Sequence, residues 1–132
     1  PEEIYFKPKN KFVAGFFSDI NTFSGKVIDS KVNFLLGTIK TNINYCEKEV
    51  EVIIRTEGIK INHKKIDNKL NIEGKISSLK QVGIFQYVNI IVQDHPKIIS
   101  ARLIDNHDIT VNSKVWLGFD PRFTFVFKKE KV

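Results

Sequence analysis

The stretch of sequence that decides the fold is VEVIIR, residues 50–55. Val50, Val52 and Ile54 recur there at every second position, and residues 32–36, VNFLL, follow the same period of two. Because successive side chains of a strand point to opposite faces, this spacing predicts half-buried β-strands at both places.

The same pattern extends along the chain from residue 26 onward. Further strands are predicted over residues 70–77, 84–92, 98–104, 115–119 and 123–127, separated by sequences rich in Asn, Asp, Gly and Pro. The 132 residues include 19 Ile and 12 Val but only 2 Ala and 6 Leu, and β-branched side chains favour strands over helices. The sequence therefore predicts an all-β domain: a closed or partly closed barrel or a sandwich, as one five-stranded barrel with extra strands or as two small β subdomains sharing a core.

The first residues depart from this pattern. Pro1 followed by two acidic residues favours a first helical turn, and a second short helix is predicted over residues 10–17, where Phe12 and Phe16 share a face. Residues 21–25, NTFSG, contain turn-forming residues and are predicted to turn.

Size and composition exclude several classes of protein. No apolar run approaches the roughly 20 residues needed to span a bilayer as a helix. The single cysteine, Cys46, cannot form an intrachain disulfide, and the first residues lack the pattern of a secretory signal. We therefore expect a reducing, cytosolic setting.

Sequence motifs of catalysis are absent. No phosphate-binding Gly-x-x-x-x-Gly-Lys-Ser/Thr motif can be written, and Cys46 has no histidine close in sequence to act as its base. Asp105, His107 and Asp108 lie together, but such residues between two strands are ordinary turn formers. We predict no catalytic, cofactor-binding or metal-binding residue in this chain.

Two aromatic groups could serve either the core or a binding surface. Phe123, Phe125 and Phe127 share one strand face, which we expect to turn toward the core rather than to form a platform for stacked bases. Trp116 should lie on the face opposite its neighbours Val115 and Leu117, at an interface or over a barrel end.

Residues 1–21, which follow the pattern PEEIYxxPxxKFVAGFFxDIN, resemble a specific segment of bacterial ATP-binding-cassette importers. It is similar to the point where the nucleotide-binding domain passes into the carboxyl-terminal transport-associated OB-fold domain. Residues 52–61 and 115–121 are similar to later strands of that domain, although Thr56 stands where the family usually has proline. The resemblance marks these residues as family-motif or interface candidates: Phe12, Phe16, Asn21, Arg55, Glu57, Trp116, Asp120 and Pro121.

The resemblance implies an OB-fold-like barrel over residues 24–132, preceded over residues 1–23 by the helical end of the nucleotide-binding domain. It implies a regulatory and dimer-organising domain without ATPase activity of its own, because ATP and Mg belong to the nucleotide-binding domain. The implied partners are that domain, a second copy and the membrane permease subunits, at the cytoplasmic face of the cell membrane. Residues 83–88 and 99–102 look most like the ferric-iron and polyamine branches, with ferric iron first.

The charge leaves one alternative open. The chain carries 21 basic and 15 acidic residues, a net charge of +6, with four lysines around residues 60–69. Basic β-barrels bind single-stranded nucleic acid in cationic grooves, so a free-standing OB-like nucleic-acid-binding module is the alternative function. We expect no nucleic-acid partner, because lysine outnumbers arginine 18 to 3 and lysine-rich loops commonly serve as solubilising surface.

Overall fold

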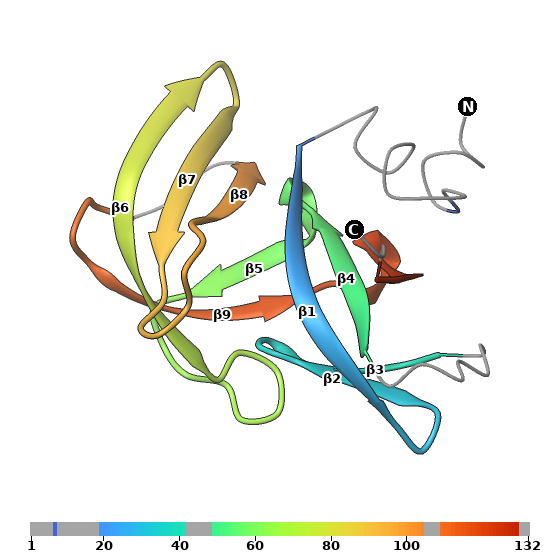
Figure 1. Cartoon of the computed structure of the whole chain (residues 1–132). Helices are drawn as coiled ribbons and strands as arrows, with labels where there is room; N and C mark the ends of the chain where they lie inside the picture. Colours follow the sequence, from blue (N-terminus) through green and yellow to red (C-terminus); the bar gives the residue numbers. More distant parts are fainter. Residues whose placement is uncertain (1–6, 8–18, 42–48, 105–108, 130–132) are drawn as a thin grey trace.

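The computed structural model describes residues 7, 19–41, 49–104 and 109–129. These residues form two five-stranded sheets in which every strand pair is antiparallel (Figure 1). Sheet A has the order β10-β4-β1-β2-β3 and consists of β1 (Ile20–Ile28), β2 (Lys31–Phe34), β3 (Gly37–Lys40), β4 (Glu49–Arg55) and β10 (Thr124–Lys128). Sheet B has the order β5-β9-β6-β7-β8 and consists of β5 (Ile59–Asn62), β6 (Ile72–Val82), β7 (Phe85–Ile91), β8 (Ile99–Ile104) and β9 (Lys114–Phe119).

A single core joins the two sheets. Val50, Val52 and Ile54 of β4 are fully buried in it, as the period of two predicted. Sheet B contributes an equally apolar set to the same cluster: Ile76, Val88, Ile90, Ile99, Val115 and Leu117. The two sheets therefore share one core.

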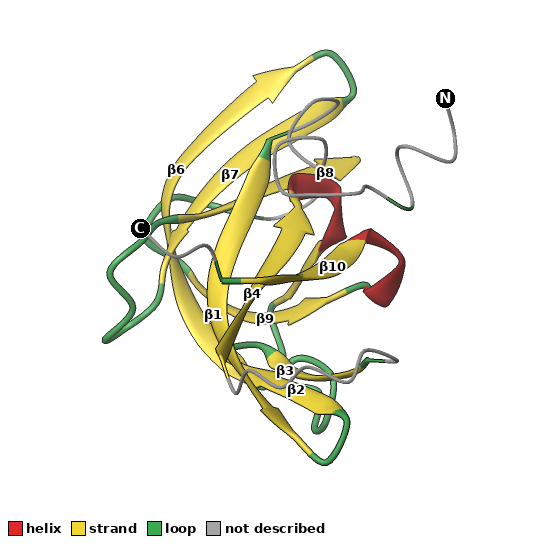
Figure 2. Ribbon diagram, turned by 45° about the vertical axis from the view of Figure 1, so that its right-hand side comes forward, coloured by secondary structure: helices red, strands yellow, loops and turns green. Residues whose placement is uncertain are grey.

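Two short 3-10 turns carry the chain from one sheet to the other. The turn η1 (Thr56–Gly58) connects β4 to β5, and the turn η2 (Pro121–Phe123) connects β9 to β10. Figure 2 shows these two turns side by side, next to the strands that they connect. Because β5 pairs with β9 and β4 pairs with β10, both crossings occur at one end of the molecule.

Sheet B is strongly curved. A β-bulge interrupts the pairing of β6 with β7 between Ile76 and Ser78, and bulges bend and twist the strand that contains them. In Figure 1 β6 accordingly sweeps along the left side of the molecule, while β5 and β9 cross its middle.

The all-β prediction is confirmed, and the predicted strands of residues 50–55, 84–92, 98–104 and 115–119 agree with β4, β7, β8 and β9 within about two residues. The predicted turn at residues 21–25 is wrong, because these residues lie inside β1. Gly25 has a packing role there: a Cβ at this position would lie 2.7 Å from Val32 Cγ1. The predicted helices of residues 1–17 lie outside the described residues, apart from Lys7. The division after residue 23 stays a prediction, although β1 already begins at Ile20.

The prediction that the three phenylalanines of the last strand face the core is also wrong. Thr124 and Val126 lie opposite Ile54 and Val52 in the β10–β4 ladder, so this face of β10 turns toward the core. Phe125 lies opposite Ile53, whose side chain is fully buried on the other face of sheet A. Since both faces of β4 are buried, alternation alone could not decide which face of β10 turns inward.

No helix among the described residues is both long enough and apolar enough to cross a membrane.

Candidate functional site

The turns η1 and η2 bring the two later family-like segments together. The backbone N–H of Asp120 donates to the carbonyl of Gly58 at 2.8 Å, which joins the start of η2 to the end of η1. Arg55 precedes η1 and Glu57 lies within it, while Asp120 caps the start of η2 and Pro121 is its first residue. Two pairs of candidates that are separated by more than 60 residues in sequence therefore meet at one end of the molecule.

Glu57 forms an ion pair at this end. Its Oε2 accepts a hydrogen bond from Arg102 Nη2 on β8 at 3.1 Å, and the Glu57 side chain is only 13% exposed. The Arg102 guanidinium also lies 4.7 Å from the centre of the Phe85 ring. The pair thus fixes η1 against the edge strand of sheet B, and a cation–π contact adds to it.

Asp120 organises the second turn. Its Oδ1 accepts from the backbone N–H of Arg122 at 2.9 Å, and its Oδ2 accepts from Arg122 Nη2 at 2.8 Å. These hydrogen bonds to Arg122 are the main cause of the lowered pKa of Asp120. The hydroxyl of Thr124 donates to the Asp120 carbonyl at 2.8 Å, so this residue begins η2 and also fixes the start of β10.

Arg55 is fully buried and lies on the outer face of sheet A, opposite the core. Its guanidinium lies 5.4 Å from the centre of the Phe125 ring, on the neighbouring strand β10. Burial of a guanidinium costs free energy unless surrounding groups compensate for the lost water, and the contact with the Phe125 ring is one such interaction.

Asn21 joins the two sheets at the same end. Its Nδ2 donates to the carbonyl of Ser100 at 2.8 Å, and its Oδ1 accepts from the Ser100 N–H at 2.7 Å. Asn21 also donates to the carbonyl of Ile54 at 3.3 Å.

Trp116 does not belong to this cluster. As expected, it lies on the face of β9 opposite the buried Val115 and Leu117, and it is half-buried. Lys65 Nζ lies 5.6 Å from the centre of its ring, and Trp116 pairs with Asn62 of β5 and Glu73 of β6.

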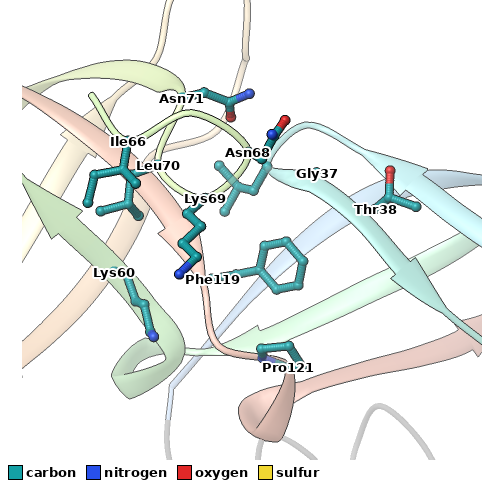
Figure 3. A pocket seen from close by; sticks show the side chains of 11 residues that line it. Gly37, Thr38, Lys60, Ile66, Asn68, Lys69, Leu70, Asn71, Phe119 and Pro121 are labelled. Atoms are coloured by element: carbon teal, nitrogen blue, oxygen red, sulfur yellow. The ribbon is translucent and has the colours of Figure 1, made fainter.

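A cavity of about 600 Å³ opens beside η2, between the two sheets. Its walls come from the β2–β3 turn, β5, the loop between β5 and β6, and the end of β9: Leu36, Gly37, Thr38, Lys60, Ile66, Asn68, Lys69, Leu70, Asn71, Phe119 and Pro121. Figure 3 shows the Phe119 ring in the middle of the cavity, with Lys60 and Lys69 to one side and Thr38 to the other. Of the candidates named from sequence, only Pro121 lines it among the described residues.

The sequence did not identify Arg102 or the cavity. Arg102 is one of only three arginines, which was an available signal, but its pairing with Glu57 depends on a fold that joins residues 45 positions apart. The cavity combines four separate segments, so no local motif marks it. Phe12, Phe16, Cys46 and residues 105–108 lie outside the described residues, and the described part holds no group of three or more His, Cys, Asp or Glu side chains that could bind a metal.

Comparison with curated proteins finds polyamine import ATP-binding proteins among the relatives of the chain. The chain is 32% identical over its whole length to the spermidine/putrescine import ATP-binding protein PotA of Clostridium acetobutylicum, of which the match covers 36%. PotA of Borreliella afzelii is 30% identical over 98% of the chain and 36% of its own length, and PotA of Hahella chejuensis is 24% identical over 98% and 40%. The chain thus spans a little over a third of the length of these relatives.

Comparison with solved structures addresses the fold. The cytoplasmic molybdate-binding protein ModG, in a molybdate-bound crystal form, matches 83% of this chain and 96% of its own chain with a TM-score of 0.63 at 10% identity. This likeness confirms the all-β, OB-like fold. No protein-family model matches the chain.

Proposed function

We propose that this chain is the OB-like accessory domain of the ATP-binding subunit of an ABC importer, and that the importer carries polyamines. The observation that carries this proposal is the similarity of the whole chain to PotA of Clostridium acetobutylicum. The resemblance of residues 1–21, 52–61 and 115–121 to bacterial ABC importers agrees with it.

The cargo is the finer part of the proposal. The relatives described above are spermidine and putrescine import proteins, which favours the polyamine branch. Ferric iron, which the sequence resemblance placed first, gains no support from these relatives.

In this proposal the chain does not hydrolyse ATP. It has no phosphate-binding loop sequence, and the charged residues that meet at η1 and η2 are engaged in ion pairs and turn hydrogen bonds rather than facing a cavity as free acids or bases. ATP and Mg would bind to a nucleotide-binding domain of the same subunit, and this chain would act on transport through contacts with other domains.

Those contacts need an accessible surface. The β6–β7 hairpin and the neighbouring end of β8 carry exposed apolar side chains: Val82, Ile84, Tyr87 and Ile104. Clustered exposed apolar residues are typical of protein contact sites. They support the proposed partners, which are the nucleotide-binding domain, a second copy and the permease subunits at the cytoplasmic face of the membrane.

A chimera tests the proposal. This chain replaces the matching segment of PotA from Clostridium acetobutylicum in cells that lack their own polyamine-importer ATPase, and uptake of labelled spermidine and ferric citrate is measured. We expect the chimera to restore spermidine uptake above that of a PotA deletion variant lacking the segment, with ferric uptake unchanged. An increase in ferric uptake would contradict the proposal that the cargo is a polyamine.

Two further results would contradict the accessory role itself. One is spermidine uptake no better than that of the deletion variant although the chimera is folded, assembled with the permease subunits and hydrolyses ATP. The other is tight binding of single-stranded DNA by the chain with an affinity that falls steeply as salt rises, which would favour the nucleic-acid-binding alternative.

A further inference from the structure

The cavity beside η2 has an apolar floor and a rigid frame. Leu36 and Leu70 are buried, and the Phe119 ring packs edge-on against Phe34 with 5.0 Å between ring centres. The backbone of Gly37 packs closely on the same ring: a Cβ at Gly37 would lie 3.1 Å from Phe119 Cε1. The floor therefore exists before any ligand arrives.

The rim of the cavity is cationic. Lys60 on β5 and Lys69 in the loop between β5 and β6 line it, and among the described lining residues there is no carboxylate. Neither lysine has an ion-pair partner within 4.0 Å in the described part of the chain. The Asp120 carboxylate is hydrogen-bonded to Arg122, which is the main cause of its lowered pKa, and the charge of Lys60 is a smaller cause.

Gly118 places these two lysines next to each other. Lys60 is its partner in the β5–β9 ladder, and the carbonyl oxygen of Lys69 lies so close to Gly118 that a Cβ there would clash with it. The turn that carries Lys69 is itself fixed, since the Ile66 and Leu70 backbones exchange two hydrogen bonds, at 2.9 and 2.7 Å, and Asn68 adopts a φ of 65°. The two ammonium groups therefore extend from adjoining, well-anchored backbone.

We propose that this cavity binds a small organic anion, whose charged group pairs with Lys60 and Lys69 and whose apolar part lies on Leu36, Leu70 and Phe119. A volume of about 600 Å³ is in the range of small-molecule sites and exceeds what a single inorganic ion fills. The amides of Asn68 and Asn71 and the hydroxyl of Thr38 add hydrogen-bonding groups at the rim.

The same chemistry disfavours a polyamine at this place. A polycation would lie against two ammonium groups with no carboxylate among the described lining residues, which is unfavourable in a partly enclosed site. The cavity is therefore a site for a ligand of opposite charge to the proposed cargo. This inference depends on the cavity alone and does not rest on the proposed function.

The test uses the fluorescent probe 1-anilinonaphthalene-8-sulfonate, which combines one sulfonate with aromatic rings. We expect saturable binding of one probe per chain, weakened about tenfold in the double variant Lys60→Gln/Lys69→Gln, because charge-assisted hydrogen bonds are lost. The matched control is Lys64→Gln/Lys80→Gln, two exposed lysines that do not line the cavity, which should bind like the wild type. Spermidine at matched ionic strength should not displace the probe.

The location of binding gives a second readout. In amide NMR spectra the probe should shift Gly37, Lys69 and Phe119, which surround the cavity. Shifts confined to the exposed apolar face around Tyr87 and Ile104 would overturn the proposal, as would equal affinity in wild type and the Lys60/Lys69 double variant, or no saturable binding up to millimolar probe.

Discussion

The side-chain amide of Asn21 on β1 pairs with the backbone of Ser100 on β8 as a neighbouring strand would. It accepts from the Ser100 N–H at 2.7 Å and donates to the Ser100 carbonyl at 2.8 Å. The chain itself links the two sheets at η1 and η2. Asn21 adds a side-chain link between sheet A and the edge strand of sheet B. The Ser100 hydroxyl continues this polar contact to Asn89 Oδ1 at 3.0 Å.

Removing this amide should destabilise the domain. Asn21→Ala leaves two backbone groups of Ser100 without their partner in a partly buried place, which should lower the free energy of unfolding by about 2 kcal/mol. Urea unfolding followed by circular dichroism measures this. The matched control is Asn33→Ala, which removes an exposed amide that accepts from the Thr38 hydroxyl, and a loss as large as that of Asn21→Ala would contradict the role given to Asn21.

The ion pair of Glu57 and Arg102 should contribute more than an exposed pair. A double-mutant cycle with Glu57→Gln and Arg102→Gln should give a coupling free energy of about 1–2 kcal/mol, because the pair is largely shielded and Arg102 also contacts Phe85. The same cycle on Glu73 and Lys114, which are 3.8 Å apart and more than half exposed, should give no more than about 0.5 kcal/mol. Equal couplings would show that burial at η1 has no energetic consequence.

His95 should make stability depend on pH. Its ring stacks on Phe23 with 5.7 Å between centres, and burial, followed by the charge of Lys97, lowers its pKa below the usual 6.5. Below pH 6.5 the unfolded chain therefore binds more protons than the folded one, and stability is lost as the pH falls toward the lowered pKa.

His95→Phe keeps an aromatic ring on Phe23 but cannot titrate. The difference in unfolding free energy between wild type and this variant should be constant above about pH 7 and should shift in favour of the variant between pH 6.5 and 5. Urea unfolding across this range measures it, with the exposed His63→Gln as control. A difference that does not change with pH would refute the assignment.

Gly118 should not tolerate a side chain. In Gly118→Ala the new Cβ would clash with the Lys69 carbonyl and with Leu70 Cδ2, so the turn of residues 66–70 must move away. We expect a loss of about 1–3 kcal/mol and weaker binding of the anilinonaphthalene sulfonate probe. Gly83→Asn is the control, because Asn accepts the left-handed backbone of this open position, and equal effects of the two changes would contradict the packing argument.

The parts of the fold that sequence predicted well are those with a strict period of two. β4 follows this period because Val50, Val52 and Ile54 face one core. The short strands β3 and β5 were missed, since four residues each carry too few alternations to be recognised. The start of β1 was predicted as a turn because Gly25 resembles loop chemistry, whereas its lack of a Cβ serves close packing against Val32 and Val52.

The sequence predicted several residues of the candidate site but not how they are arranged in space. Arg55, Glu57, Asp120 and Pro121 were named from family-like segments, and the structure gathers them around η1 and η2. Their partners could not be predicted from sequence, because Arg102 is adjacent to Glu57 only through the pairing of β7 with β8 and the crossing of η1. The cavity required the same long-range information.

The position of β10 has a consequence for how the chain is made. Both the first described strand and the last one pair with β4, so β4 has both its neighbours only when residues 124–128 have arrived. During synthesis nearly the whole segment must therefore leave the ribosome before sheet A can be completed. Until then one edge of β4 offers unpaired backbone groups, and a nascent chain stalled before residue 124 would be a substrate for chaperones or for strand exchange with another copy.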